Sequence, residues 1–258
     1  MNNSYEMYVI THKKIEYKLK HNYFPIQVGK CNTKLDLPYQ TDDTGDNISN
    51  KNANYCELTA IYWAWKNRKM PEYVGIDHYR RYFVYGITSK LVDQKYIDKY
   101  LTKYDIILPY KYTTESNVYN HFINSTSGRE KDLKNLEKII KKFYPDYLDD
   151  YKEVMNWKKS SYCNMMISSS KIFNEYCEWL FNILFELEKI TDLTGYTKQE
   201  QRIYGFLSEF LLNVWVKHNN LNIKYCNMYY IENSKVKNFL KKIKLGLRSI
   251  IKWKSTII

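Results

Sequence analysis

The run Asp77-His78-Tyr79-Arg80-Arg81-Tyr82-Phe83 gathers the side chains of this sequence that are best suited to chemistry. It follows a short apolar segment, residues 73–76, which has the composition of a buried strand. Both arginines carry a permanent charge on a rigid donor fork that suits phosphate. The acid and the histidine beside them are able to bind metal or to move protons. The run therefore indicates a site for a phosphate-bearing ligand, or alternatively a solvated end of a strand.

The elements that would position this run have the pattern of an α/β sheet with covering helices. Strands are predicted over residues 5–10, 73–77, 104–109, 162–167 and 222–231. Helices are predicted over residues 54–66, 89–102, 132–143, 146–156, 171–188 and 199–217. Ligands of open α/β sheets bind at the carboxyl ends of the strands. The candidate residues should therefore be sought just after these strands.

Three of the predicted strands end in polar side chains, and neighbouring strands would bring these ends into one crevice. The crevice would hold His12, Lys13, Asp77, His78, Arg80, Arg81 and Lys111. Such a mixture suits a diphosphate, with a divalent cation as a further candidate. The sequence has neither a GxGxxG nor a GxxxxGK[ST] motif, so it supports neither a dinucleotide site nor a P-loop. We expect no organic cofactor.

Several segments of the chain resemble one bacterial glycosyltransferase family of capsular, exopolysaccharide and lipopolysaccharide biosynthesis. They are THK at 11–13, GDNIS at 45–49, YCELT at 55–59, YWAWKN at 62–67, HYRRYF at 78–83, CNMM at 163–166, YCEWLF at 176–181 and RIYGFLSE at 202–209. The resemblance covers roughly residues 5–230, and HYRRYF and RIYGFLSE are its most specific parts. It implies a GT-A-like (Rossmann-like) fold, with a mixed central sheet, covering helices and a helical C-terminal part. It also implies a nucleotide-sugar-dependent transferase, and some members are associated with galactofuranose transfer.

The same resemblance bears on metal binding. The A-type glycosyltransferase fold normally carries a DxD metal motif at the end of a middle strand, and the matching position here is Asp77-His78-Tyr79, with a single acid. Asp77 and His78 are candidate ligands for Mn²⁺ or Mg²⁺. Alternatively, Arg80 and Arg81 neutralise the leaving diphosphate without metal. Either arrangement would stabilise the charge that develops as the glycosidic bond breaks.

The candidates for donor binding each have a structural alternative. Asp46 and Asn47 lie in a long polar loop and are candidates for contact with the nucleotide, or for making a turn. Glu57 is a candidate donor-site acid, or a helix cap. His12 and Lys13 are candidates for nucleotide contact, or a solvated strand end. His78, Arg80 and Arg81 complete the predicted donor site.

The predicted acceptor and catalytic residues lie in the second half of the chain. His121, in a loop-like region, and Asn164, a polar residue inside an apolar strand, are candidates for acceptor binding, as is Arg202. Glu209 lies seven positions after Arg202 on one predicted helix, so the two share a face or form a pair that locks the helix. The apolar neighbours of Glu209 would raise its pKa toward useful base chemistry. Glu209 is the first candidate for the catalytic base and Asp77 the second.

The net charge of +12 is concentrated at the end of the chain, where residues 235–258 hold eight basic residues and no acid. Apolar residues recur there at helical spacing, which is typical of an amphipathic helix on a membrane surface. Docking on the catalytic body is the alternative, and we expect no nucleic-acid partner. We therefore divide the chain into a glycosyltransferase domain, residues 1–232, and a basic amphipathic helix, residues 233–258.

Five cysteines without a CxxC pair indicate reduced thiols in a cytoplasmic protein. The first residues lack the apolar stretch of a signal peptide. No window reaches the roughly 18 apolar residues that a membrane-spanning helix needs. The sequence thus predicts a cytoplasmic enzyme, peripheral to the inner membrane surface. It would move a sugar from a UDP-sugar, such as UDP-galactofuranose or UDP-galactose, to a lipid-linked saccharide. The alternatives are a noncatalytic basic membrane-surface or nucleic-acid-binding protein and, ranked lower, a phosphotransferase.

Overall fold

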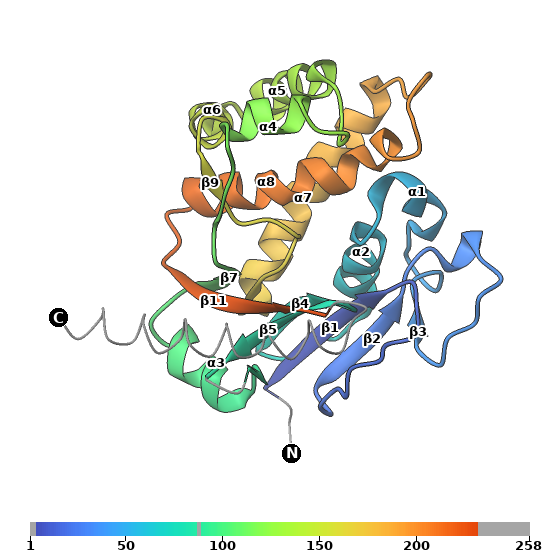
Figure 1. Ribbon diagram of the computed structural model, residues 1–258, viewed down its shortest axis with the longest axis vertical. Coiled ribbons are helices and arrows are strands. Elements are labelled where there is room, and N and C mark those ends of the chain that lie inside the picture. Colours follow the sequence, from blue (N-terminus) through green and yellow to red (C-terminus); the bar gives the residue numbers. More distant parts are fainter. Residues whose placement is uncertain (1–3, 87–88, 232–258) are drawn as a thin grey trace.

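The computed structural model describes residues 4–86 and 89–231, and Figure 1 shows how they are arranged. The largest element within them is a nine-stranded sheet with the order β3-β2-β1-β4-β10-β7-β11-β5-β6. Its strands are β1 (Tyr5–Thr11), β2 (Tyr23–Gln27), β3 (Gln40–Thr41), β4 (Tyr73–His78), β5 (Arg81–Tyr85), β6 (Lys90–Leu91), β7 (Ile106–Pro109), β10 (Ile167–Ser169) and β11 (Ile223–Tyr230). A separate ribbon pairs β8 (Tyr112–Thr113) with β9 (Lys159–Ser160).

The strand directions bring six carboxyl ends to one edge of the sheet. Strands β3, β2, β1 and β4 are parallel, and β7 is parallel to β11. Strand β10 lies antiparallel between β4 and β7, so β4 and β7 run in the same direction. The ends of β1 and β4 are therefore direct neighbours, whereas the end of β7 lies one strand further away.

Helices cover both faces of the sheet unequally. They are α1 (Asn52–Tyr55), α2 (Leu58–Asn67), α3 (Gln94–Leu101), α4 (Val118–Ile123), α5 (Glu130–Phe143), α6 (Leu148–Met155), α7 (Ser170–Ile190) and α8 (Ile203–His218), with short 3₁₀ turns η1 (Lys30–Asn32), η2 (Ser49–Lys51), η3 (Pro145–Tyr147) and η4 (Glu200–Arg202). Figure 1 shows α3 on one side of the sheet and the long helices α5, α7 and α8 on the other. We call these the rear face and the front face.

The alternation of side chains along the strands produces two separate cores. In β1, Tyr8 and Ile10 pack into the large front core, together with residues of α2, α7 and α8. Met7 and Val9 point the other way and pack with α3 in a smaller rear core. A central strand is buried on both faces in this way, which explains why β1 reads as a continuous apolar run. The predicted α/β architecture, with a mixed sheet and covering helices, is confirmed.

Four predicted elements differ from the structure, two of them at residues with a positive φ. The helix predicted over 89–102 is α3, which begins only at Gln94, and Lys90–Leu91 form the strand β6. The helix predicted over 54–66 is divided into α1 and α2, because Cys56 has a φ of 52° and interrupts the helical hydrogen bonds. The strand predicted over 162–167 begins only at Ile167, after the positive φ angles of Cys163 and Asn164. The helix predicted over 199–217 begins as the turn η4 and becomes α-helical at Ile203. Strand β2 was not predicted, because Pro25 is unusual within a sheet.

The basic tail predicted to form an amphipathic helix, residues 233–258, lies outside the described residues. Within residues 4–86 and 89–231, no helix is both long enough and apolar enough to cross a membrane.

A buried carboxylate, Asp42, ties the loops after β2 and β3 to helix α2. It is fully buried and accepts hydrogen bonds from the backbone N–H groups of Gly29 and Lys30 at 2.8 and 3.1 Å. It also accepts bonds of 2.6 Å from the hydroxyls of Ser49 and Thr59. Because Thr59 lies in the first turn of α2, this network sets the position of the chain just before it, which includes Cys56 and Glu57.

Asp42→Ala is expected to lower the free energy of unfolding by about 2–4 kcal/mol, because it leaves several buried donors without an acceptor. Urea denaturation followed by circular dichroism measures the loss. The control is Asp43→Ala, which removes no hydrogen bond within the described residues and should change stability by less than about 0.5 kcal/mol. Equal stability of the two variants would contradict a structural role for Asp42.

Candidate active site

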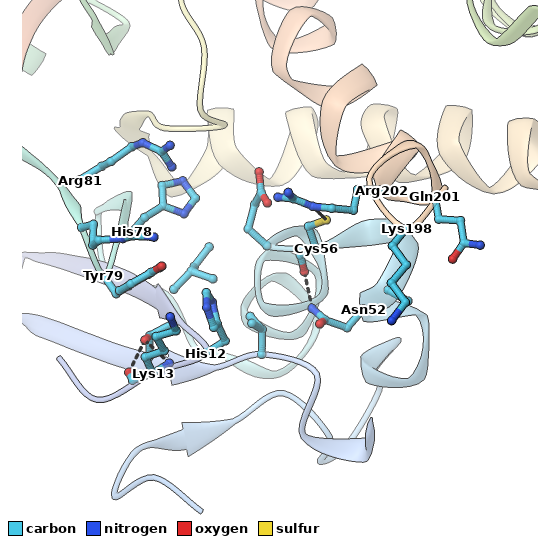
Figure 2. Close-up of a pocket in the computed structure, with 16 residues that line it drawn as sticks. His12, Lys13, Asn52, Cys56, His78, Tyr79, Arg81, Lys198, Gln201 and Arg202 are labelled. Atoms are coloured by element: carbon cyan, nitrogen blue, oxygen red, sulfur yellow. Dashed lines mark hydrogen bonds between the residues drawn. The ribbon is translucent and has the colours of Figure 1, made fainter. Parts of the chain in front are cut away.

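A cleft of about 730 Å³ opens at the carboxyl ends of β1 and β4. Figure 2 shows two facing walls, with His78 and Arg81 on one side and Lys198, Gln201 and Arg202 on the other. The lining residues are Ile10, Thr11, His12, Lys13, Val28, Asn52, Ala53, Cys56, Glu57, His78, Tyr79, Arg80, Arg81, Lys198, Gln201 and Arg202. They come from the ends of two strands, the α1–α2 turn and the segment that precedes α8.

The run of charged residues after β4 forms a tight hairpin rather than a free strand end. His78 in β4 pairs directly with Arg81 in β5, so Tyr79 and Arg80 alone make the turn. Arg80 stacks over the ring of Tyr79 at 4.8 Å, and Tyr79 meets the ring of His12 edge-on at 4.9 Å. The hairpin therefore places both arginines at the cleft as part of a strand–turn–strand unit, which the sequence alone did not predict.

The cleft carries a strong excess of positive charge. Five basic residues line it, and Glu57 is the single acidic residue among the lining side chains. The cations are Lys13, Arg80, Arg81, Lys198 and Arg202. In the part of the chain that the structure describes, none of them forms an ion pair. Burial, together with Lys13 and Arg80, lowers the pKa of His12. Such a cleft favours an anionic ligand with more than one negative charge.

His78 is held as a neutral ring in a defined tautomer. It is almost fully buried, and its Nε2 lies 2.6 Å from the carbonyl oxygen of Cys163. A carbonyl only accepts, so Nε2 carries the proton and Nδ1 remains an acceptor. Burial lowers the pKa of His78, so the ring is neutral at pH 7.

Two carboxyl groups, Glu57 and Glu209, form the acidic part of the site. Glu209 is in α8 and does not line the cleft, yet the negative charge of Glu57 acts on it. Burial and, to a smaller extent, the negative charge of Glu57 raise the pKa of Glu209 to about 8, although Arg81, the Cys163 backbone and Arg202 oppose the shift. Glu209 is therefore mostly protonated at pH 7 and becomes a base near pH 8. The predicted upward shift of its pKa is confirmed in direction.

The start of α8 approaches the α1–α2 turn closely, which explains the spacing in RIYGFLSE. A Cβ added to Gly205 would lie 3.2 Å from the Cβ and 3.3 Å from the Sγ of Cys56. Arg202 donates from Nε to that Sγ at 3.2 Å, and Ser208 donates to the Gly205 carbonyl at 2.8 Å. No ion pair joins Arg202 to Glu209 among the described residues, so the alternative of a pair that locks the helix is not found.

The structure corrects the roles predicted for Asp77. Its neighbour His78 faces the front, so Asp77 faces the rear core, where it is fully buried and accepts a bond from the Phe83 N–H at 3.1 Å. Burial raises the pKa of Asp77 well above its usual value. Because its carboxyl lies behind the sheet and not in the cleft, Asp77 does not fit the role of second candidate base.

The same geometry does not fit a metal site made by Asp77 and His78. Their side chains lie on opposite faces of the sheet, and the Nε2 of His78 is occupied by the Cys163 carbonyl. Within residues 4–86 and 89–231, no three His, Cys, Asp or Glu side chains gather as a metal-binding group. We therefore assign no reaction step to a metal held by these residues.

Other predicted residues lie away from the cleft lining. Asp46 and Asn47 make the turn that was the structural alternative: Asp46 accepts from the Tyr62 hydroxyl at 3.0 Å, and Asn47 donates to the Gly45 carbonyl at 2.9 Å. His121 lies in helix α4 rather than a loop and is exposed. Lys111 lines a separate cavity beside Trp157, because β10 separates β7 from β4.

The predicted residues that the structure brings together at the cleft are His12, Lys13, Glu57, His78, Arg80, Arg81 and Arg202. Asn164 joins them indirectly, through a hydrogen bond of 2.7 Å to Glu57. Sequence reasoning missed Lys198, Gln201 and Asn52. The proximity of the first two to the RIYGFLSE segment was an available signal, whereas nothing in the sequence pattern marked Asn52.

Comparison with known proteins adds two findings. A family model described as a domain of unknown function, DUF4422, matches residues 6–220. A solved structure described as the apo form of the bifunctional glycosyltransferase WbbM is 31% identical, with a TM-score of 0.81 over 90% of this chain. The chain covers 46% of that solved chain. No curated protein matches the sequence significantly. The likeness confirms the GT-A-like fold class expected from the sequence.

The electrostatic coupling of Glu57 and Glu209 is open to direct measurement. In ¹³C NMR of the carboxyl carbons, Glu209 should titrate near pH 8, and Glu57→Gln should move this titration to lower pH because a neighbouring negative charge is lost. Glu209→Gln assigns the signal, and Glu178→Gln, at an exposed position, is the control that should leave it unchanged. A wild-type Glu209 that titrates near the ordinary glutamate value of about 4.3 would overturn this description of the pair.

Proposed function

This chain belongs to the DUF4422 family, and we propose that it is a glycosyltransferase of bacterial cell-surface polysaccharide biosynthesis. The cleft carries the proposal, because five cations that form no ion pair within the described residues line it together with Glu57, at the carboxyl ends of two parallel strands. The description of the structural neighbour as a bifunctional glycosyltransferase supports the same reaction class. The donor is a nucleotide-diphosphate sugar and the acceptor is a saccharide.

The cations of the two walls would hold the diphosphate of the donor. Arg80 and Arg81 present forks from the hairpin, and Lys13 follows from the end of β1. When the glycosidic bond breaks, the electron pair of that bond remains on the diphosphate, whose negative charge grows. Fixed cations stabilise this charge more in the transition state than in the bound donor, which lowers the barrier. We propose that the donor is a UDP-sugar, with UDP-galactofuranose and UDP-galactose as the first candidates.

The acceptor hydroxyl must lose its proton as its oxygen bonds to the sugar. Glu209 is the proposed base for an inverting transfer, because a pKa of about 8 gives it appreciable basicity near the working pH. Burial and the nearby Glu57 keep the proton affinity of Glu209 high, so it takes up the acceptor proton readily once it is ionised. His78 would contribute its free Nδ1 as a hydrogen-bond acceptor for a sugar hydroxyl.

Metal use is proposed only in a restricted form. Asp77 and His78 do not form a binding site, so any Mn²⁺ or Mg²⁺ would enter with the donor phosphates. In that case the cations of the cleft and the metal would together neutralise the negative charge of the diphosphate. Comparison of nucleotide binding with Mn²⁺ and with a chelator measures the share that the protein supplies.

The principal test is a calorimetric titration of the full chain with UDP and with UDP-sugars, with and without Mn²⁺. Arg80→Ala is expected to weaken UDP binding about 10- to 100-fold, since a charge-assisted hydrogen bond contributes about 1.5–3 kcal/mol. The control is Lys111→Ala, which also removes one positive charge but from the separate cavity beside Trp157. Its affinity for UDP should equal that of the wild-type protein.

Absence of binding to every nucleotide tested, in both conditions, would refute the proposed donor site. Equal affinities of Arg80→Ala and Lys111→Ala would remove Arg80 from the site. A noncatalytic basic protein would show equal, salt-sensitive losses for both variants, because nonspecific binding depends on total charge. Transfer of phosphate rather than sugar, detected by mass spectrometry of the products, would favour a phosphotransferase.

We further propose that residues 235–258 attach the enzyme to the inner membrane surface, where a lipid-linked saccharide would be the acceptor. The basis is the pattern of eight basic residues and interleaved apolar residues in that segment. Basic residues near an anionic membrane each contribute about 1 kcal/mol to binding.

Deletion of residues 233–258 should therefore reduce cosedimentation with anionic phospholipid vesicles at least about 10-fold. Calorimetry should find UDP binding unchanged, because the cleft is built from residues before the tail. Cosedimentation equal to that of the full chain would contradict the anchor. Loss of UDP binding together with vesicle binding would favour the noncatalytic alternative.

A further inference from the structure

Asn164 is nearly fully buried behind the cleft, and its amide joins two parts of the site. Nδ2 donates to Oε1 of Glu57 at 2.7 Å and to the carbonyl oxygen of Gly205 at 3.1 Å. Glu57 lies just before α2, whereas Gly205 lies in the first turn of α8. The amide thus links the acid that lines the cleft to the helix that carries Glu209.

The orientation of this amide follows from the chemistry of its partners. Both the carboxylate of Glu57 and the carbonyl of Gly205 accept hydrogen bonds, so the NH₂ end must face them. Oδ1 then points away, and it is buried without a hydrogen-bond partner among the described residues. A buried acceptor without a donor is uncommon and unfavourable. The orientation of the amide thus satisfies Glu57 and leaves the Asn164 Oδ1 without a hydrogen bond within the described residues.

The backbone that carries this amide has an unusual conformation. Cys163 and Asn164 are consecutive residues without a glycine, and their φ angles are 81° and 49°. This bend turns the Cys163 carbonyl toward His78, where it accepts the bond of 2.6 Å. Consecutive left-handed residues are energetically unfavourable and are retained where surrounding contacts require them. The segment therefore holds His78 through its backbone and Glu57 through the Asn164 side chain.

We propose that Asn164 is a positioning residue for the transfer reaction, holding the Glu57 carboxylate in place beside Glu209. The proposal rests on the proposed function, but the contact itself does not. Charged and titratable groups surround the pair on several sides. They are His78 and Arg81 from the hairpin, Cys56 from the α1–α2 turn, Tyr162 and Cys163 from the segment before β10, Tyr176 from α7 and Arg202 from η4. Among the side chains of the described residues, Asn164 is the neutral hydrogen-bond donor to Glu57.

Asn164→Gly is the first test, because glycine adopts a φ of 49° without strain and so keeps the backbone while it removes the amide. The matched control is Asn220→Gly, which makes the same change at a φ of 50° beyond the far end of α8. Both variants are measured as the full chain for melting temperature, UDP affinity, donor KM and kcat. We expect kcat to fall about 10- to 100-fold in Asn164→Gly, with donor KM and UDP affinity close to those of Asn220→Gly. The melting temperature of Asn164→Gly should be the lower of the two, because its buried side chain makes two hydrogen bonds whereas Asn220 is exposed.

A double-mutant comparison tests whether Asn164 acts through Glu57. Asn164→Gly placed on a Glu57→Gln background should reduce kcat by less than about 2-fold further, because the carboxylate that it holds is already absent. Asn164→Asp is the second variant. Aspartate also tolerates the left-handed backbone, but its carboxylate cannot donate the hydrogen bond that Nδ2 gives to Glu57. It should lower kcat at least as much as Asn164→Gly, and it provides the test if the glycine variant fails to fold.

The outcomes separate this proposal from the proposed function. Wild-type turnover with equal kcat in Asn164→Gly and Asn220→Gly would overturn the positioning role and leave the transferase intact. If the wild-type protein turns over no donor, the proposed transferase function is refuted. The hydrogen bond between Asn164 and Glu57 is then tested by ¹³C NMR. The Glu57 carboxyl signal, assigned with Glu57→Gln, should then shift in Asn164→Gly but not in Asn220→Gly. An unchanged signal would overturn the contact as well.

Discussion

The arrangement of the site depends on the alternation of side chains along β4, a central strand that is buried on both faces. Consecutive residues of a strand must point to opposite faces, so Asp77 faces the rear core and His78 the cleft. Asp77 then accepts the Phe83 N–H across the hairpin, which helps to hold β5 against β4. This bond fixes the short turn that carries Arg80. Asp77 is thus a structural group: its hydrogen bond to Phe83 helps to hold the hairpin that carries Arg80 and Arg81.

The cleft is electrostatically incomplete without a ligand. Like charges gathered on facing walls repel one another, and a single carboxyl in the lining does not balance them. Some cations elsewhere in the described residues are paired, as Arg68 is with Glu6 and Arg129 with Glu200, and others are not. The particular property of this cleft is that five cations line one cavity with a single acid. A bound polyanion would reduce their repulsion, so the gathered positive charge contributes to ligand affinity.

Much of the fold was predictable because the hydrophobic periodicity of a long segment indicates whether it forms a helix or a strand. The apolar stripe of α7 and the apolar runs of β1 and β4 each specified an element and the face that it buries. The positions of strands in the sheet were not predictable, because β10 inserts between β4 and β7 and moves Lys111 away from the cleft. Likewise, the apolar neighbours of Glu209 indicated a raised pKa, but the sequence could not show that Asp77 and His78 point apart. The local sequence pattern predicts which residues are buried, whereas the order of the strands in the sheet determines which distant segments become neighbours.

Backbone strain is concentrated at the site. Of the described non-glycine residues with positive φ, Cys56, Cys163 and Asn164 all belong to it, whereas Ser89 and Asn220 lie elsewhere. These bends direct groups toward the site that a regular helix or strand would direct elsewhere. Cys56 ends α1, and the next residue, Glu57, lines the cleft. Cys163 directs its carbonyl to His78. Continuous helix over 54–66 and continuous strand over 162–167, which the local sequence favours, would be less strained but would lose these contacts. The disagreement between local preference and structure therefore falls on residues of the proposed site.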